Sequence, residues 1–269
     1  MKIGVLTSVE TRHRYFANVL RERLPIVAVG YETTGYSPAR TDDFDLTPDE
    51  RAVVAHHFDE RDRQEGLYFG GNADFVVGSS SCAAFRIGPS TLNSDRTVEL
   101  LASAGVDALA VFGTNLITEP LLGRFAGRII NMHLGLSPYY RGTATNFYPL
   151  LNEEPQYVGA TIHLIDKGID SGPILEHRRP RIVADDGPHT IGCKAILAGI
   201  EGVIAAFVEL GEGKLKPVEQ WNVPDARLYL RKDYHPRQIA QLYEKLDQGM
   251  IRRYVERADG AADPPRLIE

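Results

Sequence analysis

The sequence predicts a doubly wound α/β fold: a Rossmann-like, mostly parallel sheet flanked by helices, with a small C-terminal extension. The first observation behind this prediction is a β-α-β pattern at the N-terminus. Residues 2–6 are almost entirely apolar, as in a strand covered on both faces, and residues 26–29 form a second apolar run. Between the two runs, apolar residues recur at helical spacing, at Phe16, Val19, Leu20 and Leu24.

A second pattern of the same kind follows later in the chain. Residues 97–104 have the periodicity of a helix and residues 108–112 that of a buried strand. A short helix over 119–125 and a strand over 128–131 come next. A sheet built from such units binds its ligand in a crevice at the carboxyl ends of its strands.

The charged stretch 31–74 is predicted to be a helical insertion. Thr47-Pro48-Asp49-Glu50 has the form of a capping box with proline at the first helical position, so a helix of about five turns should begin there and reach Tyr68. This helix is expected either to pack on the sheet with one side solvated, or to act as a lid or dimer surface.

The chain is expected to divide into a main domain, an extension and a tail. Residues 1–210 contain all the α/β patterns, and residues 211–257 are predicted to form a helical extension. Its amphipathic helix, marked by Ile239, Leu242, Tyr243 and Leu246, is expected to be interrupted at Gly249. Residues 258–269 are small, polar and proline-rich, and we expect this tail to be disordered.

Charge and cysteine content limit the classes of function. The 269 residues include 30 Lys and Arg against 36 Asp and Glu, a net charge of -6, which argues against a nucleic-acid binder. Cys82 and Cys193 form no C-x-x-C pair and are interpreted as reduced core thiols. No window was expected to approach the roughly 20 apolar residues of a membrane span. These features predict a cytoplasmic enzyme or binding protein.

The segment 128–174 carries the candidate chemistry. Its first half reads RIINMHLGLSPYYRG, in which Asn131 and His133 end a strand and project from the same face, because side chains alternate along a strand. The second half reads GATIHLIDKGIDSGPIL, with a strand through His163 and Asp170 in a glycine-containing loop. An amide and an imidazole therefore lie side by side where a ligand crevice is expected.

These motifs resemble those of the folate-dependent formyltransferase family, over about residues 75–205. The resemblance makes residues 1–210 a catalytic domain, and implies that Asn131, His133 and Asp170 form the catalytic triad. It also implies that 10-formyltetrahydrofolate is the formyl donor, and that no metal is needed. His56-His57 and His189 with Cys193 lack metal-ligand spacing as well.

The resemblance also implies a pocket for the folate donor. One wall is the loop after the strand 108–112, namely Gly113, Thr114, Asn115, Leu116 and Ile117. The loop from Asp166 through Gly168 to Asp170 is the other wall. His163 is expected either to orient Asp170 and line this pocket, or to pack under the loop.

Formyl transfer to an amine explains the choice of residue types. Attack on the formyl carbon creates an oxyanion, so the site needs aimed hydrogen-bond donors and a group that moves protons. Asn131 can donate from its amide, and His133 can donate when protonated. A nearby Asp170 is expected to raise the pKa of His133, or to hold a water that relays the proton.

The predicted acceptor is the primary amine of a small molecule. The family includes enzymes for glycinamide ribonucleotide, methionyl-tRNA and amino sugars of nucleotide sugars. Glu10 stands where the ribonucleotide enzymes carry a phosphate loop, and the helical residues after Pro217 do not resemble the basic barrel domain of the tRNA enzymes. We expect an amino sugar, free or nucleotide-linked, or an amino-acid-derived metabolite. Tyr139, Tyr140 and Arg141 are the candidate substrate-binding residues.

Three other classes of protein are alternatives to a transferase. A formyltetrahydrofolate hydrolase would use water as the acceptor and would carry a regulatory domain before the first strand, which here begins at Lys2. A non-catalytic folate-binding module would not need the triad. A dinucleotide enzyme should show G-x-G-x-x-G after the first strand, and this chain does not. A homodimer is compatible with the sequence.

Overall fold

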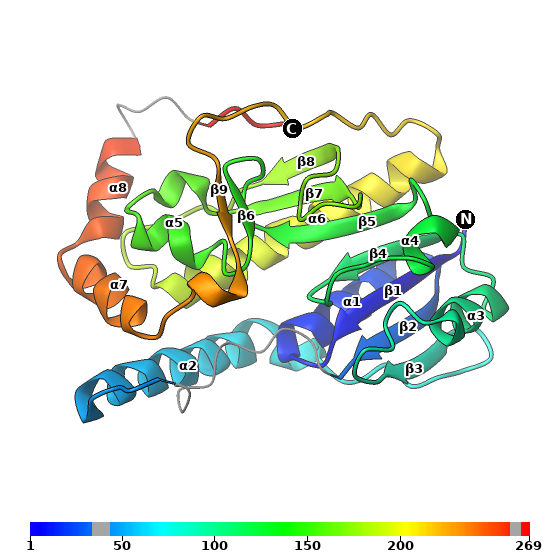
Figure 1. The fold of residues 1–269 in the computed structure, drawn as a ribbon, viewed down its shortest axis with the longest axis horizontal. Helices are drawn as coiled ribbons and strands as arrows, with labels where there is room; N and C mark the ends of the chain where they lie inside the picture. The colour runs from blue at the N-terminus through cyan, green and yellow to red at the C-terminus, as the bar shows by residue number, and fades with distance from the viewer. Residues whose placement is uncertain (34–43, 259–264) are drawn as a thin grey trace.

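A seven-stranded sheet runs through the molecule in the computed structural model, which describes residues 1–33, 44–258 and 265–269 (Figure 1). Its strand order is β3-β2-β1-β4-β5-β7-β8. Strands β3, β2, β1, β4 and β5 are parallel to one another, and β7 is antiparallel to both of its neighbours, β5 and β8. The predicted mostly parallel, doubly wound sheet is confirmed. In chain order the strands are β1 Ile3–Ser8, β2 Ile26–Glu32, β3 Ala83–Ile87, β4 Ala108–Phe112, β5 Ile129–Leu134, β7 Ala160–Leu164 and β8 Ile174–Arg178.

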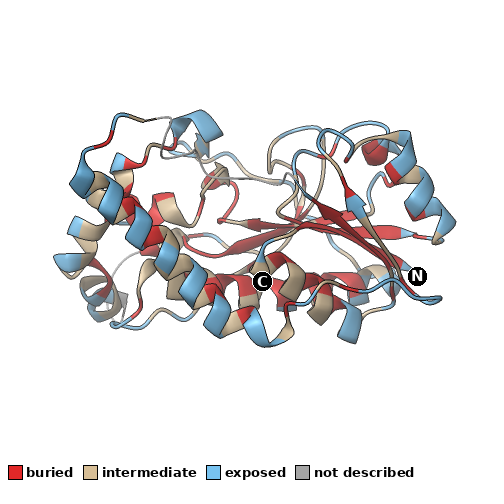
Figure 2. Cartoon of the chain, turned by 90° about the horizontal axis from the view of Figure 1, so that it is seen from below, coloured by how far each residue is buried: buried red, intermediate tan, exposed pale blue. Residues whose placement is uncertain are grey.

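Helices cover both faces of this sheet, and its strands are buried between them (Figure 2). One face packs against α1 and α6 and the other against α3 and α4. The α-helices are α1 Thr11–Arg23, α2 Pro48–Phe69, α3 Asp95–Ser103, α4 Leu121–Arg124, α5 Phe147–Leu151, α6 Pro188–Gly211, α7 Arg237–Asp247 and α8 Met250–Ala258. Short 3-10 turns are η2 Gly70–Asn72, η3 Pro155–Tyr157 and η4 Arg231–Asp233.

Helix α6 lies unusually close to the sheet because glycine occupies its contact face. A Cβ built on Gly199 would stand 2.6 Å from Met132 Sδ, and one on Gly202 would stand 2.9 Å from Ile162 Cγ1. This 24-residue helix is long and apolar enough to cross a membrane by composition, which the sequence expectation missed. Because 61% of its most apolar window is buried inside the protein, these residues serve as core.

Helix α2 confirms the predicted capping box and ends close to the predicted residue. Glu50 N donates to Thr47 Oγ1 at 3.2 Å, and Thr47 N donates to Glu50 Oε2 at 2.7 Å. The helix contacts α1, α6 and α7 rather than lying directly on the sheet. The beginning of the predicted insertion, over 34–43, lies outside the described residues.

The C-terminal extension contains a strand as well as the predicted helices. Strand β9 Arg227–Tyr229 pairs in parallel with β6 Tyr140–Gly142 to form a second, two-stranded sheet (Figure 1). The predicted interruption at Gly249 is present, since α7 ends at Asp247 and Gly249 has a φ of 79°. The division of domains at residue 210 stays a prediction.

The last residues differ from the expected disordered tail. His177 N in β8 donates to Ile268 O at 2.7 Å, and Ile268 N donates to His177 Nδ1 at 2.9 Å. The guanidinium of Arg266 lies 4.3 Å from the ring centroid of Trp221. Residues 265–269 therefore bind along β8, while 259–264 lie outside the described residues.

Candidate active site

The alternation of side chains on β5 brings Asn131 and His133 to one cleft. Both line it, whereas the side chain of Met132 between them packs into the core against α6. In the antiparallel pair with β7, Asn131 lies opposite His163 and His133 lies opposite Thr161. The cleft lies at the carboxyl ends of β1, β4 and β5, where the order of strands along the chain changes direction.

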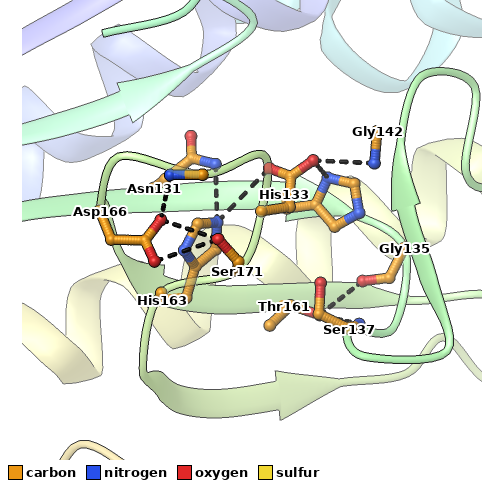
Figure 3. Close-up of polar contacts among 12 residues, drawn as sticks. Asn131, His133, Gly135, Ser137, Gly142, Thr161, His163, Asp166 and Ser171 are labelled. Atoms are coloured by element: carbon orange, nitrogen blue, oxygen red, sulfur yellow. Dashed lines mark hydrogen bonds and ion pairs between the residues drawn. The ribbon is translucent and has the colours of Figure 1, made fainter. Parts of the chain in front are cut away.

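His163 fixes the orientation of the Asn131 amide (Figure 3). Its Nδ1 lies 2.9 Å from Leu164 O, so Nδ1 carries the proton that this carbonyl accepts. Its Nε2 is then free to accept from Asn131 Nδ2, at 3.0 Å. Because an amide nitrogen has two hydrogens, Asn131 keeps one further N–H for a ligand.

Asp170 lies between both histidines and the loop that contains β6. Its Oδ2 is 3.3 Å from His133 Nδ1, and its Oδ1 is 3.6 Å from His163 Nε2. Its Oδ2 also accepts from Gly142 N at 2.9 Å, the bond drawn to Gly142 in Figure 3. Asp170 has a φ of 46°, a conformation that asparagine and aspartate adopt more readily than other side chains.

The Asp170 backbone is held from the C-terminal extension. Gln220 Nε2 donates to Asp170 O at 2.8 Å and to Gly172 O at 2.9 Å. On the other side of the loop, Ser171 Oγ donates to Asp166, and Gly168 N donates to Asp166 Oδ1 at 2.9 Å. These bonds fix the loop that carries the carboxylate.

The electrostatics of the pair keep Asp170 ionised and His133 mostly neutral. Burial pushes the pKa of Asp170 upward, but the neighbouring His133 and the Gly142 amide outweigh it and hold this pKa well below its usual range. Burial also lowers the pKa of His133, and the Asp170 carboxylate opposes this change without reversing it. The expected raised pKa of His133 is therefore wrong in its net direction, because the buried ring loses hydration that one carboxylate does not replace.

The second nitrogen of His133 also faces an acceptor. Its Nε2 lies 3.1 Å from Tyr140 O and 3.3 Å from Thr145 Oγ1, whose hydroxyl donates to Leu134 O. A neutral ring has one N–H, so it satisfies only one of the acceptors at its two nitrogens. The proton of a neutral His133 can therefore reside on Nδ1, facing Asp170, or on Nε2, facing Tyr140 O.

The cleft has a volume of about 790 Å³ and contains both predicted walls of the donor pocket. Leu116 is 61% exposed at its rim, while Ile117 is buried. Glu32, at the end of β2, holds the preceding residue, Asn115, by accepting from its backbone N and its Nδ2, each at 2.8 Å. Apolar side chains and rigid backbone groups of this kind fit a flat heteroaromatic ring such as the pteridine of folate.

The structure brings the predicted donor-site residues together with the triad. All eleven of these residues line the cleft: Gly113, Thr114, Asn115, Leu116, Ile117, Asn131, His133, His163, Asp166, Gly168 and Asp170. His163 contacts both Asn131 and Asp170, so the alternative that it merely packs under the loop is not observed.

The predicted acceptor residues do not line this cleft. Tyr140 is fully buried, and its hydroxyl contacts Glu154, Asn152 and Arg227. Tyr139 donates to Arg266 O at 3.1 Å. Arg141 likewise lies outside the cleft lining. The structure therefore does not bring Tyr139, Tyr140 and Arg141 to the lining of the cleft, and their role in binding the acceptor stays a prediction.

Several residues of the cleft were missed from the sequence. Thr145 contacts His133 in the cleft, and His57, Arg61 and His189 line a further part of it. Glu32 does not line the cleft but holds Asn115 of the 113–117 loop from behind. They come from segments far apart in the chain, without a local motif. In the described part of the chain, no group of three or more His, Cys, Asp or Glu is arranged to hold a metal.

A comparison with known families identifies the class to which this fold and site belong. A family model described as "Formyl transferase" matches residues 49–206, more than half of the chain. The chain belongs to the formyl transferase family.

Curated relatives of the chain include methionyl-tRNA formyltransferases. The protein of Thermodesulfovibrio yellowstonii is 29% identical over 146 residues, which cover 54% of this chain and 47% of that protein. That of Caldanaerobacter subterraneus subsp. tengcongensis is 35% identical over 115 residues, covering 43% and 37%. The chain thus spans half or less of the length of these relatives.

Solved structures share the fold at low identity. A 4-N formyltransferase from Francisella tularensis superposes with a TM-score of 0.55 at 17% identity, over 90% of this chain and 86% of that one. Phosphoribosylglycinamide formyltransferase from Anaplasma phagocytophilum gives 0.55 at 15%, over 85% and 97%. An N-formyltransferase from Helicobacter canadensis, in complex with folinic acid and dTDP-3-aminofucose, gives 0.52 at 16%, over 87% and 72%.

Proposed function

We propose that this protein transfers the formyl group of 10-formyltetrahydrofolate to a primary amine of a small molecule. The observation that carries the proposal is the group of Asn131, His133, His163 and Asp170, which contact one another and face one cleft. Family membership and the fit of the two loops to a pteridine support the same donor.

The donor supplies an activated formyl group, and the protein supplies positioning, a hydrogen-bond donor and a path for the proton. The 113–117 loop and the 166–170 loop hold the ring. Asn131 directs its remaining amide N–H to the formyl oxygen, which gains negative charge as the amine attacks. Loss of such a donor costs about 3 to 4 kcal/mol in the barrier.

His133 moves the proton. As the new bond forms between the amine nitrogen and the formyl carbon, the neutral ring accepts a proton from that amine. The proton then passes to the folate nitrogen as its bond to the formyl carbon breaks. The ionised Asp170, 3.3 Å from Nδ1, stabilises the imidazolium that exists between these two events.

The acceptor that we propose is an amino sugar, free or nucleotide-linked, or an amino-acid-derived amine. Glu10 lines the cleft directly after β1, where its charge disfavours a phosphate bound at that point, the position of the phosphate loop in the ribonucleotide enzymes. The names of the relatives include enzymes for methionyl-tRNA, glycinamide ribonucleotide and sugars, so the names alone do not choose among these acceptors. A cytoplasmic location and a homodimeric state stay predictions.

The test follows release of tetrahydrofolate in the presence of candidate amines. Calorimetry with 5-formyltetrahydrofolate first establishes donor binding, and absence of binding by folded protein would contradict the proposed donor site. A panel of amino sugars, nucleotide-linked amino sugars, amino acids, methionyl-tRNA and glycinamide ribonucleotide follows. Release that needs an amine identifies a transferase, whereas full release in water alone identifies a hydrolase.

A further inference from the structure

The cleft continues beyond the triad to a wall that the proposed reaction does not yet use. This α2–α6 wall consists of His57 and Arg61 from α2 and His189 from the first turn of α6, all of which line the cleft. The ring centroids of His57 and His189 lie 4.3 Å apart. Two segments far apart in the sequence thus place three nitrogen-rich side chains at one end of the same cavity.

Both histidines of the wall have an unused hydrogen-bonding atom. His57 is only 7% exposed, yet its Nδ1 has no hydrogen-bond partner within the described residues, and the same holds for His189 Nε2. Buried polar atoms are nearly always paired, so each unpaired one calls for an explanation. Both atoms are themselves covered, so a polar ligand in the cleft would provide the missing partner once either ring turns toward it.

The charge on this wall is positive. Arg61 is 26% exposed, and its ion pair, at 2.8 Å, is with the adjacent and largely exposed Asp62. Such a surface pair contributes little, so a ligand can compete for the guanidinium. Glu60, whose charge acts on His189, is already paired with Arg63 at 2.7 Å. Glu65, which also lines the cleft, is paired with Arg12 at 2.5 Å.

The start of α6 adds to this positive character. The first backbone N–H groups of a helix have no partner within it, and they carry the positive end of the helix dipole. Here Pro188 and His189 line the cleft, and the first in-helix bond runs from Ile191 N to Gly187 O. Burial, together with His189 and Arg61, lowers the pKa of His57 to about 3, so its ring binds as a neutral group.

We infer that the α2–α6 wall binds an acidic group of the acceptor, a carboxylate or a phosphate, through Arg61 with hydrogen bonds from His57 and His189. This inference rests on the proposed function, because it assumes that the acceptor amine enters the same cleft. It narrows the acceptor to amines that carry an acid, such as an acidic or phosphorylated amino sugar or an amino acid. A neutral free amino sugar would leave the wall unused.

Binding of simple anions tests the wall without catalysis. Calorimetric titration with inorganic phosphate, and separately with acetate, uses the wild type, Arg61→Gln and Arg51→Gln. Arg51 is the matched control, since it is exposed on the same helix and does not line the cleft. We expect the preferred anion to bind Arg61→Gln at least about tenfold more weakly and Arg51→Gln within about twofold of wild type.

The two anions distinguish the sources of the acidic group. Stronger phosphate binding indicates a phosphorylated acceptor, and stronger acetate binding indicates a carboxylate. Binding of neither anion to wild type, or equal binding to wild type and Arg61→Gln, would overturn the inference. Titration with 5-formyltetrahydrofolate is run in parallel, so that failure of the donor site is seen separately from failure of the wall.

Kinetics with matched amines add a second readout. Glucosamine is compared with glucosamine 6-phosphate, and alaninamide with alanine, by the ratio of kcat/KM within each pair. The wild type and Arg51→Gln should prefer the acidic member of one pair by about tenfold or more, and Arg61→Gln should lose that preference. Preference for both neutral amines in wild type would contradict the inference while supporting the transferase itself.

Discussion

In the proposed mechanism Asn131 and His133 have different tasks, although they lie two residues apart on β5. The Asn131 amide is held by His163 and offers one remaining N–H, which suits a fixed donor to a developing charge. His133 faces acceptors at both nitrogens, and in the proposed reaction it changes its protonation. Each group serves the transition state more than the bound ground state.

The first prediction concerns the triad. Asn131→Ala, His133→Ala and Asp170→Ala should each lower kcat at least about a hundredfold while leaving affinity for 5-formyltetrahydrofolate within about tenfold. Single-turnover kinetics and calorimetry measure the two quantities, and His56→Ala, at an exposed position of α2, is the control. Near-normal turnover in any one variant would remove that residue from the triad.

The second prediction follows from the lowered pKa of His133. If the neutral ring takes the proton from the amine, kcat should rise with pH through a pKa below 6.5 and be level at neutral pH. Asp170, whose pKa is also lowered, should stay ionised over this range. The profile of kcat between about pH 5 and 8 tests this, with an amine in excess. Activity that falls as pH rises through this range would instead assign His133 the role of a protonated donor.

At the scale of elements, the catalytic loop depends on the C-terminal extension. Gln220 binds the carbonyls of Asp170 and Gly172, and thereby fixes the carboxylate against His133. The segment that contains Gln220 is continuous with β9, which pairs with β6 beside Gly142. The extension therefore holds the Asp170 backbone through Gln220, and it pairs with the strand whose Gly142 N donates to the Asp170 carboxylate.

The third prediction is that Gln220→Leu lowers kcat roughly tenfold to a hundredfold through misplacement of the loop. Hydrogen exchange should become faster for the amides of 166–172, a change that separates loss of positioning from simple destabilisation. Gln64→Leu is the control, because Gln64 is a partly buried amide on α2 that binds Glu60. Unchanged kcat together with unchanged exchange would show that Gln220 has no positioning role.

Two glycines of α6 provide the fourth prediction. Gly199→Ala should lower the free energy of unfolding by about 1 to 3 kcal/mol, because its Cβ would meet Met132 and Ala160 within 2.8 Å. Gly192→Ala should raise it by up to about 1 kcal/mol, since no atom lies within 4 Å and alanine favours a helix. Urea denaturation compares the two variants, and equal effects would contradict the close packing of α6 on β5.

At the scale of the whole molecule, local patterns predicted the parts of the site that lie on one strand or one loop. The period of two on β5 placed Asn131 and His133 on one face, and the capping box located the start of α2. The burial of Tyr140 was not predicted because the pairing of β6 with β9 joins segments about ninety residues apart, which no local period encodes. The α2–α6 wall and the Gln220 contacts were missed for the same reason.

The contact of residues 265–269 with β8 is another long-range feature, and it depends on a neutral histidine. His177 Nε2 donates to Ser137 O at 2.7 Å, while its Nδ1 accepts from Ile268 N. The ring therefore uses both nitrogens as a neutral group. Burial lowers the pKa of His177 to about 4, opposed by the bond to Ser137.

The last prediction is that acid destabilises the protein and releases this C-terminal segment. Between pH 6.5, the ordinary histidine pKa, and about 4, the unfolded chain binds a proton that folded His177 does not. The free energy of unfolding must then fall as pH falls through this window, by at most about 3 kcal/mol from this one group. Protonation also removes the acceptor for Ile268 N, so the segment should detach first.

Trp221 provides the measurement. It is the single tryptophan of the chain and lies under Arg266, with its ring centroid 6.1 Å from that of His177. Its emission should change on acidification before the far-UV circular dichroism does, and urea midpoints should fall over the same range. His177→Asn should show a smaller fall in stability between pH 7 and 4 than wild type, whereas His56→Asn, the control for loss of one histidine, should match wild type. If Trp221 emission and the urea midpoint in wild type both stay constant down to pH 4, protonation of His177 does not govern the attachment of the segment.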